Sequence, residues 1–416
     1  MADIAPSPVV EWLASRREAM LSLLGELVAI DSGTANHRGV AQVAARLAAF
    51  FAEAGIETEP VVVEGSGAGL RVTIPGAKSA RPILLMGHLD TVFPEGEAAR
   101  RPFSIVGDRA YGPGVADMKG GLVLLAFVLA ALQAVGGDLP PLVGFFTADE
   151  EIGSPAYRPL IEAEARHADF AFNAEPGRAS GNVVTSRRGG VFMRVTIEGK
   201  AAHAGVDSRA GISAIDELAH KIVALHALTD LERGINLNVG VVDGGQSVNT
   251  TAASATALVD LRFREPEDRD RMMKAVEDIV AKSWTAGTRS RLEVTGGFLP
   301  IVPTAASTAL FDLYRSSAEA IGFSVGGEAT GGCADSGFAA AMGAAALCGV
   351  GPVGGGAHSP AEYVEIDSLV PRAQALALTI QRLAEAVDDQ NSHPRAQDAG
   401  DPSPRRQSAA PQRETS

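Results

Sequence analysis

The sequence predicts an α/β fold in which a mostly parallel sheet flanked by helices is interrupted by an inserted ferredoxin-like α+β domain. Three observations predict it. Solidly apolar runs such as residues 83–86 alternate with amphipathic helical stretches, a pattern typical of buried parallel strands. From about Arg188 the runs alternate apolar and polar residues instead, as in 191–199. Solid apolar runs then return, as in 345–350.

The composition excludes several classes of partner. The chain has 416 residues, which allows two or three domains, and its net charge of −14 argues against nucleic acid or an anionic membrane as a partner. The most apolar segment, residues 122–135, is too short to span a bilayer and is expected to be a core helix. With two cysteines and no signal-like N-terminus, we expect a cytoplasmic protein.

The first domain is expected over residues 1–187, and its elements follow from hydrophobic spacing. Helices are expected over 8–30, 38–54 and 122–135, and strands over 61–63, 69–74, 83–88, 142–147 and 170–173. Several of these strands end at an acidic residue or a histidine, and in open α/β sheets sites form beyond the carboxyl ends of strands.

The inserted domain is expected over residues 188–297, because its elements follow the order β-α-β-β-α-β of a ferredoxin-like layer. The first domain resumes over 298–387 with a helix at 307–321, a strand at 345–350 and a closing helix at 367–387. Residues 388–416 are polar and almost free of large apolar side chains, so we expect a disordered tail.

Five residues stand out as candidate metal ligands: His88, Asp117, Glu151, Glu175 and His358. Two histidines and three carboxylates suit Zn²⁺, with Co²⁺ or Mn²⁺ as alternatives. Five ligands are too many for one open zinc site, but they fit two ions if one carboxylate bridges. Each residue alone has a plainer interpretation, such as a core histidine or a surface acid.

Two further residues have expected roles beside these ligands. Asp90 lies two positions after His88, so both side chains are expected on one face, where a carboxylate can hold a metal-bound imidazole. Glu150 precedes Glu151, and adjacent side chains diverge; one can ligate while the other accepts a proton from water. Without the remaining ligands, residues 149–151 would be interpreted as an acidic loop.

The chain resembles the M20 metallopeptidases, and among them the glutamate carboxypeptidases of the carboxypeptidase G type. The motifs that carry the resemblance occur in the family's order: GHLDTV (87–92), GPGVADMKGG (112–121), TADEEIGS (147–154), AEPG (174–177), GKAAHAG (199–205) and GGGAHSPAEYVEI (354–366). The resemblance implies a zinc-peptidase fold with two zinc ions per chain and a cis peptide after Asp117. It also implies that Asp117 bridges one ion bound by His88 and Glu175 and another bound by Glu151 and His358.

The resemblance also implies that Glu150 is the general base and that Asp90 orients His88. The inserted domain would be a lid and dimerisation domain. His203 would stabilise the oxyanion, in some members from the partner subunit, and Asn249 and Arg262 would bind the substrate carboxylate. The chain departs from the carboxypeptidase G pattern at residues 250–252, which replace a proline, and at the apolar stretch 296–303, where glutamate-specific relatives carry an arginine.

The sequence therefore predicts a dinuclear-zinc hydrolase that cleaves an amide bond next to a free carboxylate and releases a C-terminal amino acid such as glutamate. Its substrate would be a small peptide or N-acyl amino acid, and it would form a homodimer. The enzymatic alternatives are an N-acyl-amino-acid amidohydrolase and a dipeptidase. The non-enzyme alternative is an inactive relative that binds a ligand or metal.

Overall fold

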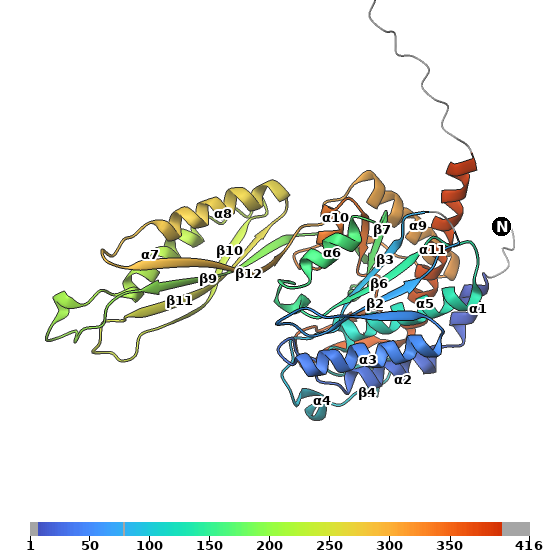
Figure 1. Cartoon of the computed structure of the whole chain (residues 1–416), viewed down its shortest axis with the longest axis horizontal. Helices are drawn as coiled ribbons and strands as arrows, with labels where there is room; N and C mark the ends of the chain where they lie inside the picture. Colours follow the sequence, from blue (N-terminus) through green and yellow to red (C-terminus); the bar gives the residue numbers. More distant parts are fainter. Residues whose placement is uncertain (1–6, 78–79, 393–416) are drawn as a thin grey trace, which may run out of the picture.

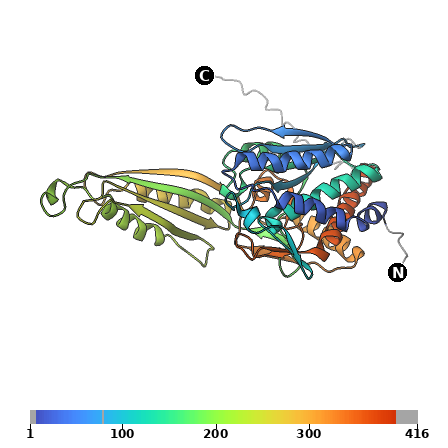
Figure 2. The ribbon, with the colours of Figure 1, turned by 90° about the horizontal axis from the view of Figure 1, so that it is seen from below.

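The computed structural model describes residues 7–77 and 80–392, so residues 393–416 of the expected tail lie outside the described part. Figure 1 shows a large body built around one sheet and a smaller sheet-and-helix layer that projects to one side of it. Figure 2 shows the same two parts from a perpendicular direction. We call the smaller layer the lid.

The body is organised around an eight-stranded sheet with the order β1-β2-β6-β3-β7-β14-β8-β13. Its central strands β6, β3, β7 and β14 run parallel, whereas β2 pairs antiparallel with both β1 and β6. The strands are β1 (Glu57–Val61), β2 (Gly69–Ile74), β3 (Ile83–His88), β6 (Leu142–Thr147), β7 (Phe170–Asn173), β8 (Val183–Arg187), β13 (Gly327–Thr330) and β14 (Ala345–Cys348). The α/β prediction is confirmed, with a sheet that is mixed because its edges add antiparallel pairs.

Helices flank this sheet, and the buried faces of all but the short helix Glu97–Arg100 form one continuous core with it. They are α1 (Pro8–Ala14), α2 (Arg17–Val28), α3 (His37–Glu53), α4 (Glu97–Arg100), α5 (Gly120–Val135), α6 (Arg158–Ala165), α9 (Ala305–Ile321), α10 (Ser336–Ala341) and α11 (Leu369–Ser392). Together with the turn before α5, Val115–Val135 is long and apolar enough to cross a membrane by length and composition, but 94% of its most apolar window is buried inside the protein. The expected core helix is therefore observed.

The lid has a four-stranded antiparallel sheet with the order β10-β11-β9-β12. Its elements are β9 (Gly189–Glu198), α7 (Ala214–His226), β10 (Asn236–Gly244), β11 (Ser254–Phe263), α8 (Pro266–Ala281) and β12 (Arg289–Phe298). The chain order β-α-β-β-α-β and the strand order both match a ferredoxin-like layer. Its hydrophobic core is separate from that of the body.

A third, small sheet was not expected from the sequence. It has the order β15-β16-β5-β4, with β4 (Ser104–Val106), β5 (Arg109–Tyr111), β15 (Gly354–Gly355) and β16 (Tyr363–Glu365). The loop with Asp117 follows β5, and His358 lies between β15 and β16. Since β16 pairs with β5, two segments more than 200 residues apart are held beside each other.

Three expectations about individual elements were wrong. The helix expected over 8–30 is two helices separated at Ser15 and Arg16. The strand expected over 61–63 is β1, which ends at Val61 and is largely exposed. The closing helix α11 continues to Ser392, so the first residues of the expected tail are helical.

Candidate metal centre

The ends of three parallel strands bring the acidic and histidine residues to one edge of the sheet. His88 ends β3 and pairs in register with Thr147, the last residue of β6. Residues 149–151 follow β6, and Glu175 follows β7, which also pairs parallel with β3. Because the carboxyl ends of parallel strands lie on the same side, these side chains converge.

Asp117 lies on a tight turn before α5 and occupies the centre of the cluster. Its Oδ1 is 3.1 Å from His88 Nε2, and its Oδ2 is 3.3 Å from His358 Nε2. The Asp117–Met118 peptide bond is cis, as the resemblance implies. One carboxylate thus faces two imidazoles, with a different oxygen toward each.

The remaining candidate ligands divide between the two histidines. His88 Nε2 lies 3.6 Å from Glu175 Oε1, and His358 Nε2 lies 3.2 Å from Glu151 Oε2. His358 itself has a left-handed backbone with φ of +62°. Each imidazole therefore has one carboxylate of its own in addition to the shared Asp117.

Asp90 fixes the surroundings of His88 in two ways. Its backbone oxygen is 2.9 Å from His88 Nδ1, closer than its carboxylate Oδ1 at 3.4 Å. Its carboxylate accepts hydrogen bonds from the backbone N–H groups of Glu150 and Glu151, each at 3.2 Å, and from the Thr34 hydroxyl at 2.7 Å. Asp90 thus holds both His88 and the loop that carries the two glutamates.

The Asp117 turn is held by Glu362, which lies in the motif at residues 354–366 and was not predicted to have a role. The buried carboxylate of Glu362 accepts hydrogen bonds from the backbone N–H groups of Gly114, Ala116 and Asp117, each at 2.9 Å. Burial raises the pKa of Glu362 to about 7, and the three N–H groups oppose that rise.

The electrostatics follow from packing several carboxylates around two imidazoles. Burial raises the pKa of Glu150 well above its usual range, and the nearby Glu175 adds to the rise. Burial also raises the pKa of Glu151 to about 7. Hydrogen bonds to Asp117 and Glu151 raise the pKa of His358 to about 10. The cluster concentrates negative charge that a bound cation would neutralise.

The donor set fits divalent metal ions. His88, Asp117 and Glu151 offer ligand atoms within 4.8 Å of one another, as do His88, Glu150 and Glu175. Among the described residues, Glu151 Oε1 and Glu175 Oε1 are buried without a hydrogen-bond partner. Buried carboxylate oxygens without a partner are costly, and ligation of a metal ion would satisfy them.

Glu150 lies farther from His88 than Asp117 and Glu175 do. Its Oε2 is 4.0 Å from His88 Nε2, compared with 3.1 Å for Asp117 and 3.6 Å for Glu175. The side chain is buried at the cluster, so it is close enough to act on a group bound there.

Arg187 and Asp335 also contact this region and were not selected from the sequence. The buried Arg187 lies 3.7 Å from Glu175 and donates a hydrogen bond to the backbone oxygen of Cys333. Asp335 accepts hydrogen bonds from the hydroxyls of Thr147 and Ser154 behind the cluster. The only signals in the sequence were an arginine pair at 187–188 and a Gly-rich stretch at 330–338.

The three expected lid residues do not join the cluster within this chain. Arg262 lies at the lid–body junction, where its Nη1 is 2.6 Å from Cys333 Sγ. His203 and Asn249 lie together beyond the other end of the lid sheet; the backbone N–H of Ala204 donates to the Asn249 oxygen at 2.9 Å. His203 is exposed, and its Nδ1 accepts hydrogen bonds from two nearby backbone N–H groups.

Comparison with known proteins places this geometry in a family. Residues 84–382 match Peptidase family M20/M25/M40. The chain is 32% identical to Carboxypeptidase G2 of Pseudomonas sp. over 371 aligned residues. The aligned region covers 86% of this chain and 88% of that protein. The chain belongs to the M20 family. The M20 chain is also 30% identical over 232 residues to the acetylornithine deacetylase of Salmonella arizonae, covering 52% of this chain and 59% of that protein.

Solved structures support the same fold for this M20 protein. The di-peptidase Dug1p of Saccharomyces cerevisiae superposes with a TM-score of 0.72 at 17% identity, covering 91% of this chain and 98% of that one. The metallo-carboxypeptidase Sso-CP2 of Sulfolobus solfataricus gives a TM-score of 0.71 at 17% identity, covering 88% and 99%. The chain is a metal-dependent peptidase or amidohydrolase, so the non-enzyme alternative is set aside.

Proposed function

We propose that this M20 enzyme is a dinuclear-zinc hydrolase that cleaves an amide bond next to a free carboxylate and releases a C-terminal amino acid such as glutamate. The observation that carries the proposal is the position of Asp117, whose two oxygens each face a different histidine. A carboxylate placed in this way suits two ions that share one bridging ligand.

Five residues would hold the ions. His88, Asp117 and Glu175 would bind one, and Asp117, Glu151 and His358 would bind the other, in keeping with the pairing of acids and imidazoles. Zn²⁺ suits these nitrogen and oxygen donors, and Co²⁺ or Mn²⁺ would be substitutes. When bound, such a pair polarises the scissile carbonyl and makes water a better nucleophile.

The chain's own residues would then position the substrate and move its protons. Glu150 would accept a proton from the attacking water and later deliver it to the leaving amine. Asp90 would keep His88 oriented, and Arg262 would bind the substrate carboxylate. Asn249 lies beside His203 at the far end of the lid, so it would reach that carboxylate only from a partner subunit.

His203 would stabilise the oxyanion from the partner subunit of a homodimer. Arg262 and His203 lie at opposite ends of the lid sheet. Arg262 pairs with Gly190 near the start of β9, at the junction with the body, whereas His203 follows the far end of the same ten-residue strand. Nine steps of about 3.3 Å separate the ends of that strand by about 30 Å. A second subunit is the simpler source of an imidazole at the metal site.

The two free cysteines support a cytoplasmic location.

Release of amino acids from a substrate panel tests the function. The panel contains N-acyl amino acids and dipeptides with the same C-terminal residues, measured with zinc and with a chelator. We expect zinc-dependent release of the C-terminal amino acid and no hydrolysis of substrates whose carboxylate is amidated. Faster cleavage of unblocked dipeptides would favour the dipeptidase, and equal cleavage of amidated substrates would contradict the carboxylate requirement. Preference for acetylated amino acids would favour the amidohydrolase, the activity named for the Salmonella relative.

A further inference from the structure

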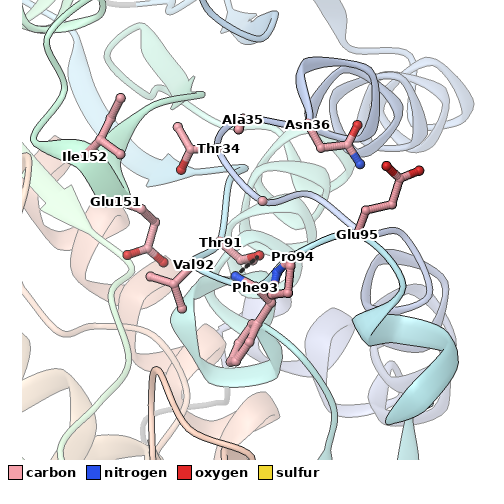
Figure 3. A pocket seen from close by; sticks show the side chains of 11 residues that line it. Thr34, Ala35, Asn36, Thr91, Val92, Phe93, Pro94, Glu95, Glu151 and Ile152 are labelled. Carbon is pink, nitrogen blue, oxygen red and sulfur yellow. Dashed lines mark hydrogen bonds between the residues drawn. The ribbon is translucent and has the colours of Figure 1, made fainter. Parts of the chain in front are cut away.

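The pocket drawn in Figure 3 lies beside Glu151 and forms part of the metal centre described above. A separate pocket of about 280 Å³ lies where the lid joins the body, and we call it the junction pocket. Its lining comes from the end of β8 (186–188), the connection after β12 (301–303), the end of β13 (329–331) and the residues after β11 (264–265). A ligand in this pocket would therefore contact both the lid and the body.

Arg187 lines the junction pocket, but its guanidinium is engaged on the side of the metal centre. Its Nη1 donates to the Cys333 backbone oxygen at 2.9 Å, and its Nη2 lies 3.7 Å from Glu175. Arg188 continues the pairing of β8 with β13, since its backbone N–H donates to the Thr330 oxygen at 3.3 Å. Adjacent side chains of a strand point to opposite faces, so the Arg188 side chain is directed away from the metal centre.

Two arginines of the lining have no acidic partner. Arg188 is half-buried and Arg264 is exposed, and neither forms an ion pair with any residue that the structure describes. The Arg264 side chain lies over Gly234, where an added Cβ would be 2.5 Å from its Nε. The exposed Glu265 is the only acid among the described residues of the lining. The junction pocket thus carries an excess of positive charge in a chain whose net charge is −14.

A hydroxyl group and the size of the pocket narrow the class of ligand. Thr330 Oγ1 accepts a hydrogen bond from the Gly332 N–H at 3.3 Å, and its own proton has no acceptor among the described residues. A volume of about 280 Å³ is at the lower end for small-molecule sites. At pH 7 a phosphate group carries about −1.5 to −2 charges. One guanidinium can bond two of its oxygens, so two arginines and a hydroxyl suit a phosphate group better than a singly charged carboxylate.

The two arginines belong to different parts of the molecule. Arg188 lies at the end of the body segment, directly before the first residue of β9, whereas Arg264 follows β11 within the lid. The connection from β12 back to the body lines the same pocket at residues 301–303. A group bound by both arginines would therefore restrain the lid relative to the body and cover one of the connections between them.

We propose that the junction pocket binds a phosphate group, either free phosphate or the phosphate ester of a small metabolite, and that the bound group ties the lid to the body. Arg188 and Arg264 bind the phosphate oxygens, and Thr330 donates its hydroxyl to them. Binding here needs neither metal ions nor hydrolysis, so it is independent of the proposed function.

Isothermal titration calorimetry of the chelator-treated full chain tests the binding, because the metal centre without its ions is acidic and does not hold an anion. Inorganic phosphate and glycerol phosphate are titrated separately, at an ionic strength held constant with potassium chloride. We expect one site per chain with a Kd below about 1 mM for at least one probe. Tighter binding of glycerol phosphate would identify an ester as the ligand, and tighter binding of inorganic phosphate would identify the free ion.

Substitutions locate the bound phosphate. Arg188→Gln and Arg264→Gln should each raise the Kd at least about tenfold, because each removes charge-assisted hydrogen bonds. Arg289→Gln is the matched control and should bind like the wild type. Arg289 is exposed on β12 and pairs in register with Glu198, at the far end of β9. Arg264→Gln changes an exposed side chain, so it decides the test even if Arg188→Gln does not fold.

Hydrogen exchange measures whether the ligand ties the lid to the body. At a probe concentration ten times the wild-type Kd, the amide hydrogens of residues 298–302 should exchange about tenfold more slowly in the wild type. At the same concentration, exchange in Arg264→Gln should slow by less than about twofold.

Three results would contradict the proposal. The absence of binding for both probes would overturn it, and equal affinity of the two variants and the control would show an adventitious ion only. Binding without slower exchange in residues 298–302 would overturn the tie between lid and body. None of these results bears on hydrolysis, which is measured with zinc-loaded protein and substrates.

Discussion

Replacing Glu362 tests whether a buried carboxylate holds the Asp117 turn in place. Glu362→Gln keeps the shape of the side chain and changes one oxygen to an amide NH₂. In the wild type, Oε1 accepts from Ala116 and Asp117, and Oε2 accepts from Gly114, each at 2.9 Å. The remaining oxygen of the glutamine can keep two of these hydrogen bonds. The third backbone N–H group then faces the side-chain NH₂ group, which is also a donor.

The expected loss follows from counting those bonds. A hydrogen bond to a charged group contributes about 1.5–3 kcal/mol, and a buried donor left without a partner costs about 1–3 kcal/mol. Glu362→Gln should therefore lower the free energy of unfolding by about 2–3 kcal/mol. Glu362→Ala, which removes all three bonds, should lower it by about 4 kcal/mol. Both variants should also bind metal more weakly, since Asp117 is no longer anchored.

Guanidinium chloride unfolding with chelator, at pH 8 where the carboxylate is mostly ionised, measures the stability loss. Zinc titration of each variant at the same pH measures the loss of metal affinity. Glu365→Gln is the matched control: Glu365 lies on the same strand β16, and its half-exposed carboxylate is 3.5 Å from Arg109. Such a surface pair contributes about 0–1 kcal/mol. If Glu362→Gln unfolds and binds zinc like this control, the turn is held by other contacts and the reasoning is wrong.

Three further substitutions test other parts of the account. Glu150→Gln should keep the fold and both metal ions but lower kcat by about 10²–10⁴, and retention of more than half of the wild-type kcat would rule Glu150 out as the base. His203→Ala should lower kcat by about 10²–10³ with unchanged metal content. Mixing the His203→Ala protein with the Glu150→Gln protein should restore activity if His203 acts from the partner subunit. If activity does not return after verified subunit exchange, His203 does not act from the partner subunit. Burial raises the pKa of Asp335 from 3.8 to about 7, so the folded state keeps a proton that the unfolded state loses, and stability should fall as pH rises from about 4 to 7. Asp335→Asn should flatten this fall by about 2–4 kcal/mol in chelator-treated protein, and an unchanged pH dependence of unfolding would show that Asp335 is ionised throughout.

The strand-end residues of the site could be predicted because periodicity locates buried strands, and parallel strands end at the same edge. His88, Glu151 and Glu175 converge for that reason. Asp117 and His358 could be selected from the sequence as candidate ligands, but no strand pattern placed them at this edge of the sheet. The small sheet that holds their loops together consists of strands of two or three residues, too short to leave a hydrophobic pattern.

Other features escaped the sequence analysis for physical reasons of their own. Strand β1 is an exposed edge strand with two glutamates and a proline, so it has no apolar face to recognise. The separation of α1 from α2 leaves the apolar spacing almost intact across Ser15 and Arg16. Glu362, Arg187 and Asp335 are charged residues whose burial depends on partners far away in the chain. Long-range pairing of this kind leaves no local signal.

The metal content of active protein tests the central claim most directly. Each chain is proposed to hold two ions, with Asp117 shared between them. Elemental analysis of freshly purified protein, normalised to the number of active sites found by inhibitor titration, should return two zinc ions per chain, and His358→Ala should return one with most activity lost. One tightly bound ion per chain in fully active wild-type protein would contradict the dinuclear account.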